Sequence, residues 1–207
     1  VDRIVPATTE EDIAGMSRRL GVLDRATVRT EAFSQWILED RFAGEHPDFA
    51  AVGVQLTTSV APWEDAKLRL LNGAHSAIAY LGGLAGIEFV HQFVEDDVRR
   101  RFVGHLWDEA QATLSPPPGL DLAAYRAALL ARFANPALQH RTWQIAVDGS
   151  QKLPQRLVAS AAARLDRGLA VEALALAIAA WMRWQEGRDG QGEPYLLDDP
   201  LASTTRR

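Results

Sequence analysis

Four polar side chains that could move and hold protons occur within one short segment. Glu64, Lys67, Asn72 and His75 lie in the run 63–76, which is otherwise rich in leucine and alanine. On a helix, at about 100° per residue, all four fall within an arc of about 140°. Charged groups in an apolar setting are costly to desolvate unless they are paired or used. Burial also lowers the pKa of an ammonium group toward neutrality, so a lysine there is a candidate general acid/base.

The same spacing leaves a simpler interpretation open. Surface helices normally carry a polar face, so the four residues could form a solvated stripe. Glu64 and Lys67 could likewise form only an i, i+3 ion pair. The charges of 95–97 and 99–101 are interpreted as a solvated face of this kind.

The size and composition of the chain limit its function classes. With 207 residues, 47% of them apolar and 24% charged, the chain is long enough for one large domain with a sizeable core. Its formal charge of −5 offers no basic patch, so no nucleic-acid partner is expected. The absence of cysteine excludes disulfides and thiolate zinc sites, and it fits a reducing, cytoplasmic location.

Neither a membrane segment nor a metal site is expected. The longest apolar run, 169–182, contains Glu172 and is too short for a membrane span, so it is predicted to be a buried helix. No H-E-x-x-H motif occurs. The histidines that could bind a metal are scattered along the sequence, at His75, His91, His105 and His140.

Local signals in the first third of the chain predict a helix and two strands. Thr9 is placed to cap a helix that runs to Leu20 and stops at Gly21. Aromatic and β-branched residues predict short strands at 33–42 and 52–60, which would form a small sheet.

The rest of the chain is predicted to be helical. Pro62 suits the first turn of the helix that carries the four polar residues, and that helix should end at the glycine pair after Leu81. Further helices are predicted over 86–91, 96–112, 122–133, 153–168 and 169–185. The predicted fold class is therefore mainly α, a multi-helix domain with a minor β element.

Several long stretches resemble one family of enzymes. The run W-E-D-A-K-L-R-L-L-N-G-A-H-S at 63–76 resembles the signature of the polyol-specific long-chain dehydrogenases/reductases, the family of mannitol 2-dehydrogenase and fructuronate (mannonate) reductase. The likeness continues through 135–146 and 148–156. Residues 1–6 look like the junction between the two domains of the family, and 199–202 look like its C-terminal segment.

The resemblance implies a catalytic role for each of the four polar residues. Lys67 would be the base in alcohol oxidation and the acid in ketone reduction. Asn72 would donate to the carbonyl or alkoxide oxygen, His75 would hold a neighbouring substrate hydroxyl, and Glu64 would belong to a proton path to solvent.

The resemblance also implies substrate contacts outside this segment. The turn residues 148–150 should aim Lys152 at the pocket, and Arg141 is a second candidate. A hexuronate would bring a carboxylate that such cations could bind. Asp2 matches an aspartate at the domain junction. The motif does not separate a polyol from an aldonate as substrate, although 140–155 looks closer to the fructuronate and mannonate group.

The cofactor site is expected to lie mostly outside this chain. Family members carry a nucleotide-binding Rossmann domain on the N-terminal side, which would bind NAD or NADP. The G-x-G-x-x-G fingerprint is missing here, since the glycines of 82–86 have another spacing and follow a helix. Residues 1–8 are therefore predicted to be the junction with that domain, and 9–207 the helical substrate-binding domain. The first residue, which is not methionine, also indicates a piece of a longer protein, inactive by itself.

A non-catalytic function remains the alternative. A helical module that binds a partner, or one that only dimerises, would have the same composition. It would not require Lys67, Asn72 and His75 to gather in one place.

Overall fold

The structure is a computed structural model that describes residues 2–205. Its contacts divide the chain into two units, Val1–Val60 and Ala61–Arg207. The run 63–76, called the lysine segment from here on, lies wholly in the second unit with its four polar residues. The boundary predicted after residue 8 concerns a junction with another domain and stays a prediction.

Helix α1 (Glu10–Leu20) in the first unit begins and ends where its sequence predicts. The Asp12 N–H donates to the Thr9 hydroxyl (3.2 Å), and the Thr9 N–H donates to the Asp12 carboxylate (2.9 Å), which forms a capping box. Gly21 ends the helix in the left-handed conformation, at a φ of 73°. The predicted helix is confirmed.

The first unit also contains a two-stranded sheet. Strands β1 (Ile37–Glu39) and β2 (Gln55–Thr57) run parallel, with Ile37 opposite Gln55, and the 3₁₀ helix η1 (Ala50–Val52) precedes β2. Both strands are shorter than predicted. In the connection from β1 to β2 the chain is not extended. There the rings of Phe42 and Phe49 stack, with their centroids 5.6 Å apart.

The second unit is built almost wholly of helices, so the predicted mainly α fold with a minor β element is confirmed. Its helices are α2 (Ala61–Ala66), α3 (Gly73–Leu84), α4 (Val90–Glu95), α5 (Asp97–Gln111), α6 (Leu122–Phe133), α7 (Thr142–Ile145), α8 (Gly149–Leu153), α9 (Ala159–Leu165), α10 (Glu172–Trp184) and α11 (Ala202–Thr205). Two π-helical segments, η2 (Lys67–Asn72) and η4 (Pro154–Val158), and the 3₁₀ helix η3 (Pro136–Leu138) complete it.

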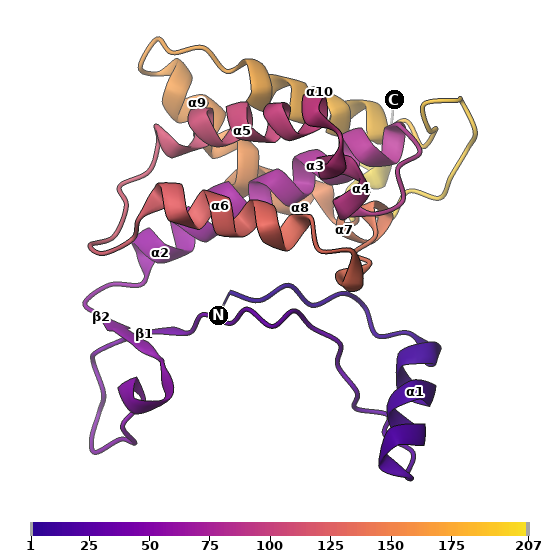
Figure 1. Cartoon of the computed structure of the whole chain (residues 1–207). Coiled ribbons are helices and arrows are strands. Elements are labelled where there is room, and N and C mark those ends of the chain that lie inside the picture. Colours follow the sequence, from indigo (N-terminus) through magenta and orange to yellow (C-terminus); the bar gives the residue numbers. More distant parts are fainter. Residues whose placement is uncertain (1, 206–207) are drawn as a thin grey trace. The chain divides into compact units, whose positions relative to one another are not determined.

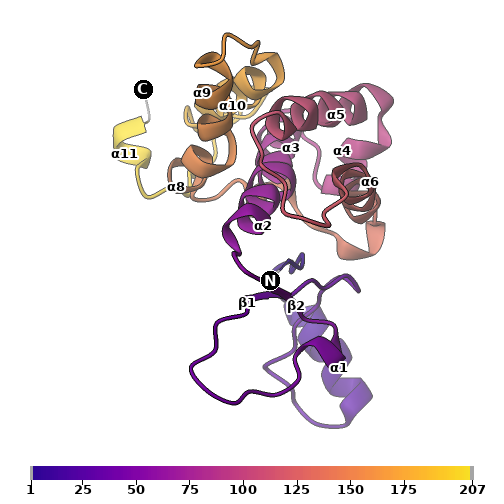
Figure 2. The ribbon, with the colours of Figure 1, turned by 90° about the vertical axis from the view of Figure 1, so that its left-hand side faces the viewer.

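Helix α3 is the centre of the second unit. It packs against α10, α7, α4 and α5, and ten of its twelve residues are buried. Figure 1 shows α3 with α5 and α10 running beside it, and Figure 2 shows it between α5 on one side and α8, α9 and α10 on the other. Polar side chains at the start of α3 therefore enter a largely desolvated interior.

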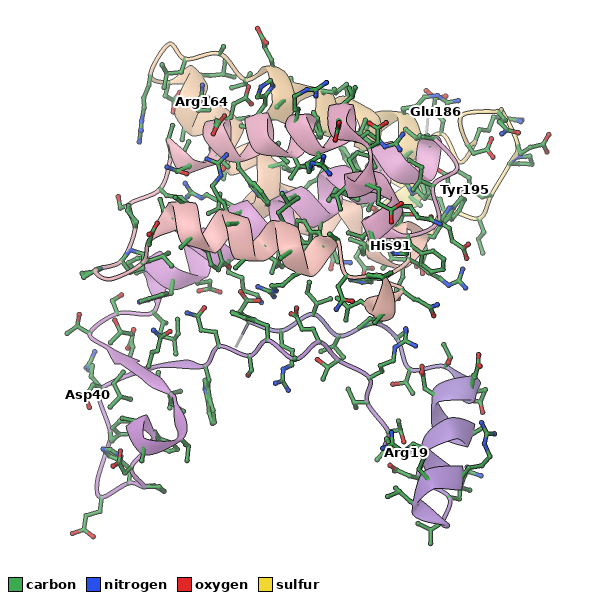
Figure 3. All side chains as sticks on the ribbon, viewed as in Figure 1. Arg19, Asp40, His91, Arg164, Glu186 and Tyr195 are labelled. Carbon is green, nitrogen blue, oxygen red and sulfur yellow. The ribbon has the colours of Figure 1, made fainter. Side chains whose placement is uncertain are left out.

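The glycine pair in α3 does not end the helix, contrary to the prediction. Helix α3 continues through Gly82 and Gly83 to Leu84, and Gly86 follows it with a φ of 71°. A Cβ at Gly83 would lie 2.5 Å from the Trp184 ring. Gly83 therefore allows the close packing of α10 on α3, while Gly82 faces Thr142 of α7 and Phe93 of α4. Tyr195, labelled in Figure 3, also packs on Trp184, with the two ring centroids 4.5 Å apart.

The remaining helices agree with the sequence where a cap is present. Asp96 and Asp121 cap α5 and α6 through their carboxylates, and α6 has the predicted bounds. The helix predicted over 86–91 is wrong in its position, because α4 begins only at Val90. The helix predicted over 153–168 is divided between α8, η4 and α9. No helix among residues 2–205 combines the length and apolar character needed to cross a membrane.

The packing of Trp184 on Gly83 gives a stability prediction. Replacing Gly83 by alanine should lower the free energy of unfolding by about 1–3 kcal/mol, because the added methyl group overlaps the indole. Gly104→Ala in α5 is the matched control. Its new Cβ meets nothing within 4 Å, so it should raise stability by up to about 1 kcal/mol. Urea unfolding measures both, and equal stabilities for the two variants would contradict this packing.

Candidate active site

The middle of the lysine segment, η2, is a π-helix that joins the α-helix of Glu64 (α2) to that of His75 (α3). In η2 the Gly73 N–H donates to the Leu68 carbonyl, an i→i+5 bond. A π turn holds more residues than an α turn, so the helical arc predicted from 100° per residue does not apply within the segment. Short π-helical insertions occur often at functional sites, because they redirect side chains without ending a helix.

Two contacts anchor η2 to the end of α5. The indole N–H of Trp107 donates to the Leu70 carbonyl in a buried hydrogen bond of 2.8 Å. The Arg69 guanidinium donates to the carbonyl of Thr113 (2.7 Å) and lies 3.7 Å from the Asp65 carboxylate. Trp107 and Arg69 therefore hold the segment in place, and neither contact uses the side chain of Lys67 or Asn72.

The four predicted catalytic side chains differ in burial. Glu64 is exposed, Lys67 and Asn72 are half-buried, and His75 is buried at 7% exposure. Within the described residues no side-chain hydrogen bond or ion pair joins Lys67 or Asn72 to the protein, and the predicted alternative, a Glu64–Lys67 ion pair, does not form. The Nε2 atom of His75 is also buried without a partner. Three of the four groups are thus available to a ligand.

His75 is held in its neutral form. Its ring lies against Phe133 (centroids 4.6 Å apart) and edge-on to His140 (5.2 Å). Burial, followed by the nearby His140, Arg156, Arg132 and Lys67, holds the pKa of His75 well below its ordinary value. A neutral imidazole offers one donor and one acceptor, which suits a hydroxyl group better than an anion.

A second π-helical segment brings Arg156 to the same place. Segments η2 and η4 pack together, and a Cβ at Gly73 would lie only 2.9 Å from the Arg156 carbonyl oxygen. The Arg156 guanidinium donates to the Ser76 hydroxyl (3.2 Å), next to His75. Its Nε atom is buried without an acceptor, and burial lowers the pKa of Arg156.

Lys152 lies one turn before Arg156 and is fixed by the turn that precedes it. Its ammonium donates to the Val147 carbonyl (2.7 Å) and lies 3.7 Å from Asp148. Burial, with the nearby charge of Arg156, lowers the pKa of Lys152, while Asp148 partly opposes this. The turn is tied down by Asp199, whose carboxylate accepts from the Ser150 N–H (2.8 Å).

The two other predicted substrate-binding residues lie elsewhere. Arg141 is exposed, forms an ion pair with Glu88 and lies over the Phe89 ring at 5.1 Å. The structure thus gives its guanidinium a surface partner. Asp2 belongs to the first unit, where its backbone pairs with Gln35. Its role in substrate binding stays a prediction.

His140 and Arg156 are the neighbours of His75 that the sequence analysis did not single out. The i, i+4 spacing of Lys152 and Arg156 was the available signal for the arginine, whereas nothing in the spacing connected His140 with His75. The other histidines stay apart: His91, labelled in Figure 3, stacks on Phe89. Nowhere in residues 2–205 do three His, Cys, Asp or Glu side chains gather as metal ligands.

Comparisons with known proteins show the family and the fold of the chain. The model of the mannitol dehydrogenase C-terminal domain matches residues 59–207. D-mannonate oxidoreductase of Escherichia coli is 47% identical over 97% of this chain and 42% of its own length. Mannitol 2-dehydrogenase of Pseudomonas fluorescens, solved in a ternary complex with NAD and D-mannitol, is 36% identical with a TM-score of 0.91, over 99% of this chain and 42% of that one.

The chain belongs to the mannitol dehydrogenase family, of which it contains the C-terminal domain. It spans about two fifths of the length of the relatives it matches, including the E. coli oxidoreductase YdfI, which is 46% identical over 41% of its length. The family predicted from the sequence motifs is therefore confirmed.

The buried histidines give a prediction for stability against pH. Burial lowers the pKa of His140 from 6.5 to about 4, so below pH 6.5 the unfolded chain binds a proton that the folded chain does not. Stability should therefore fall as the pH drops through 6.5, by about 2 kcal/mol from His140 alone between about pH 8 and 5, and level off below about 4. His75 adds a loss of the same sign.

Urea unfolding of the protein and of His140→Asn at several pH values tests this. The variant should lose most of that slope, whereas the exposed His105→Asn control should keep it. A slope that is unchanged in His140→Asn would contradict the assignment.

Proposed function

We propose that this chain is the substrate-binding and proton-transfer domain of an NAD(P)-dependent oxidoreductase that interconverts a polyol or aldonate with its keto sugar, without a metal. The observation that carries the proposal is the set of partnerless groups at the start of α3: the ammonium of Lys67, the carboxamide of Asn72 and Nε2 of His75. The names of the relatives in the family support the same reaction class.

Lys67 and Asn72 would act on the reacting oxygen. During oxidation Lys67 accepts the hydroxyl proton, and during reduction it returns a proton to the ketone oxygen. Asn72 donates an amide N–H to the same oxygen, where negative charge develops. Both side chains come from η2, whose backbone is fixed by Trp107 and Arg69, so their separation would be set before the substrate binds.

His75 would orient the substrate. Because burial and its cationic neighbours keep its pKa low, it is neutral at physiological pH and does not compete with Lys67 as an acid. Its partnerless Nε2 would hydrogen-bond a hydroxyl group next to the reacting carbon. Glu64, exposed one turn before Lys67, would pass the proton on to solvent.

The nicotinamide cofactor would be held mainly by a Rossmann domain of the same protein outside these residues. The relatives are more than twice as long as this chain. Within residues 2–205 no glycine-rich loop joins a strand to a helix N-terminus, the arrangement that cradles dinucleotide phosphates. When bound, the cofactor supplies the hydride acceptor. The residues of this chain bind and orient the alcohol and move its proton.

Replacing Lys67 by methionine in the full-length protein tests the proposal. The variant keeps the length and apolar stem of the side chain but has no proton to exchange, so kcat should fall by about 10²–10⁴-fold. The change is measured as the steady-state rate of mannitol and of mannonate oxidation, with NADH formation as the signal.

Arg101→Met is the matched control, because it removes a cation that is exposed on α5. It should leave kcat unchanged. If Lys67→Met turned over at the wild-type rate with a normal melting temperature, the role of Lys67 would be refuted.

A further inference from the structure

Arg156 has fewer acceptors than other half-buried arginines of the second unit. Arg164, which also has no ion pair among the described residues, donates to the carbonyls of Ala170 and Glu109, and two others lie near carboxylates. Arg69 lies 3.7 Å from Asp65, and Arg126 lies 2.8 Å from Asp108. Arg156 makes no ion pair within the described residues and bonds only the neutral Ser76 hydroxyl. A desolvated charge without a counter-ion is costly. This one is kept in the interior without a protein carboxylate to offset that cost.

The free donors of Arg156 are placed for a ligand. A guanidinium has five N–H donors in a planar fork, which fits the two oxygens of a carboxylate. One nitrogen of Arg156 bonds Ser76, and the buried Nε has no acceptor. The backbone of Arg156 is held against Gly73, so the guanidinium is anchored at the start of α3.

The charge around this position is positive. The ammonium of Lys67 and the guanidinium of Arg156 both lie close enough to His75 to disfavour its protonation, and no carboxylate is among the main charges acting on that ring. Arg156 acts in the same way on Lys152, on which the carboxylates of Asp148, at 3.7 Å, and of Asp198 act in the opposite direction. A neutral polyol would leave Arg156 without a carboxylate partner, whereas an anionic substrate would supply one.

We propose that Arg156 binds the carboxylate of a sugar acid, assisted by Lys152, so that the enzyme uses an aldonate and its ketouronate in preference to the matching neutral polyol. The inference rests on the proposed function and names the substrate class of that same site. The charges of Arg156 and of Lys67 both act on His75, so the group that would bind the carboxylate and the group that would move the proton share this neighbour. Arg156 is thus a specificity residue, and Lys67 and Asn72 remain the groups that act on the reacting oxygen.

The test compares two substrates that differ only at one terminal carbon, mannonate and mannitol, with the full-length protein. The wild type should show the higher kcat/KM for mannonate. In Arg156→Gln the value for mannonate should fall by about 100-fold or more, because a buried charge-assisted pair is lost. The value for mannitol should change by less than about threefold. Arg156→Lys should lie between, since an ammonium keeps the charge but not the fork.

Arg126→Gln is the matched control for the loss of a half-buried arginine. It removes a guanidinium that lies 2.8 Å from Asp108 and should leave the ratio of the two substrates unchanged. Two results would overturn the carboxylate role: Arg156→Gln lowers kcat/KM equally for both substrates, or the wild type prefers mannitol. Either result would leave the proposed oxidoreductase function intact. A wild type that oxidises neither sugar would overturn the proposed function itself.

Calorimetric titration of the wild type with each sugar gives a readout that depends on neither turnover nor a variant. Mannonate should bind at least about tenfold more tightly than mannitol, and the advantage should shrink as salt is added. Equal affinities would contradict the proposal even if Arg156→Gln did not fold.

Discussion

The close approach of two π-helical segments at Gly73 is the constraint on which the site depends. A Cβ at this position would lie 2.9 Å from the Arg156 carbonyl, so only glycine lets the backbones of η2 and η4 meet at this distance. The contact joins the segment that carries Lys67 to the one that carries Arg156. Both segments pack on α3, whose start is buried, so the segments that carry the proposed proton-transfer and carboxylate-binding cations meet although they are distant in the sequence.

Desolvation then determines what each polar group can do. His75 is buried beside cations and stays neutral, so it can hydrogen-bond a hydroxyl but cannot carry a charge through the reaction. Lys67 and Asn72 are less buried and have no protein partners. Two charged residues nearby in the sequence do have partners. Arg69 lies near the Asp65 carboxylate and donates to the Thr113 carbonyl. Arg69 therefore anchors the segment, whereas Lys67 and Asn72 keep their polar groups free for the roles proposed for them.

Sequence alone predicted the elements that carry strong local signals. The capping box of Thr9 and Asp12 and the aspartate cap of α6 fixed helix bounds, because a cap is made by residues close in the chain. The π-helical register of 67–72 and the continuation of α3 through Gly83 depend on Trp107 and Trp184, which are distant in sequence. Lys67, Asn72 and His75 were predicted from a motif, whereas the convergence of His140 and Arg156 on His75 required the fold.

Chemical rescue measures the central claim, that the amine of Lys67 exchanges a proton with the substrate. Full-length Lys67→Ala protein would be assayed with a series of small primary amines of increasing basicity. The account predicts that they restore turnover in proportion to concentration, with a rate that depends on amine basicity, and that they do not restore Asn72→Ala. Failure of every amine that fits the vacated space to restore Lys67→Ala, in a variant that folds and binds substrate, would contradict it.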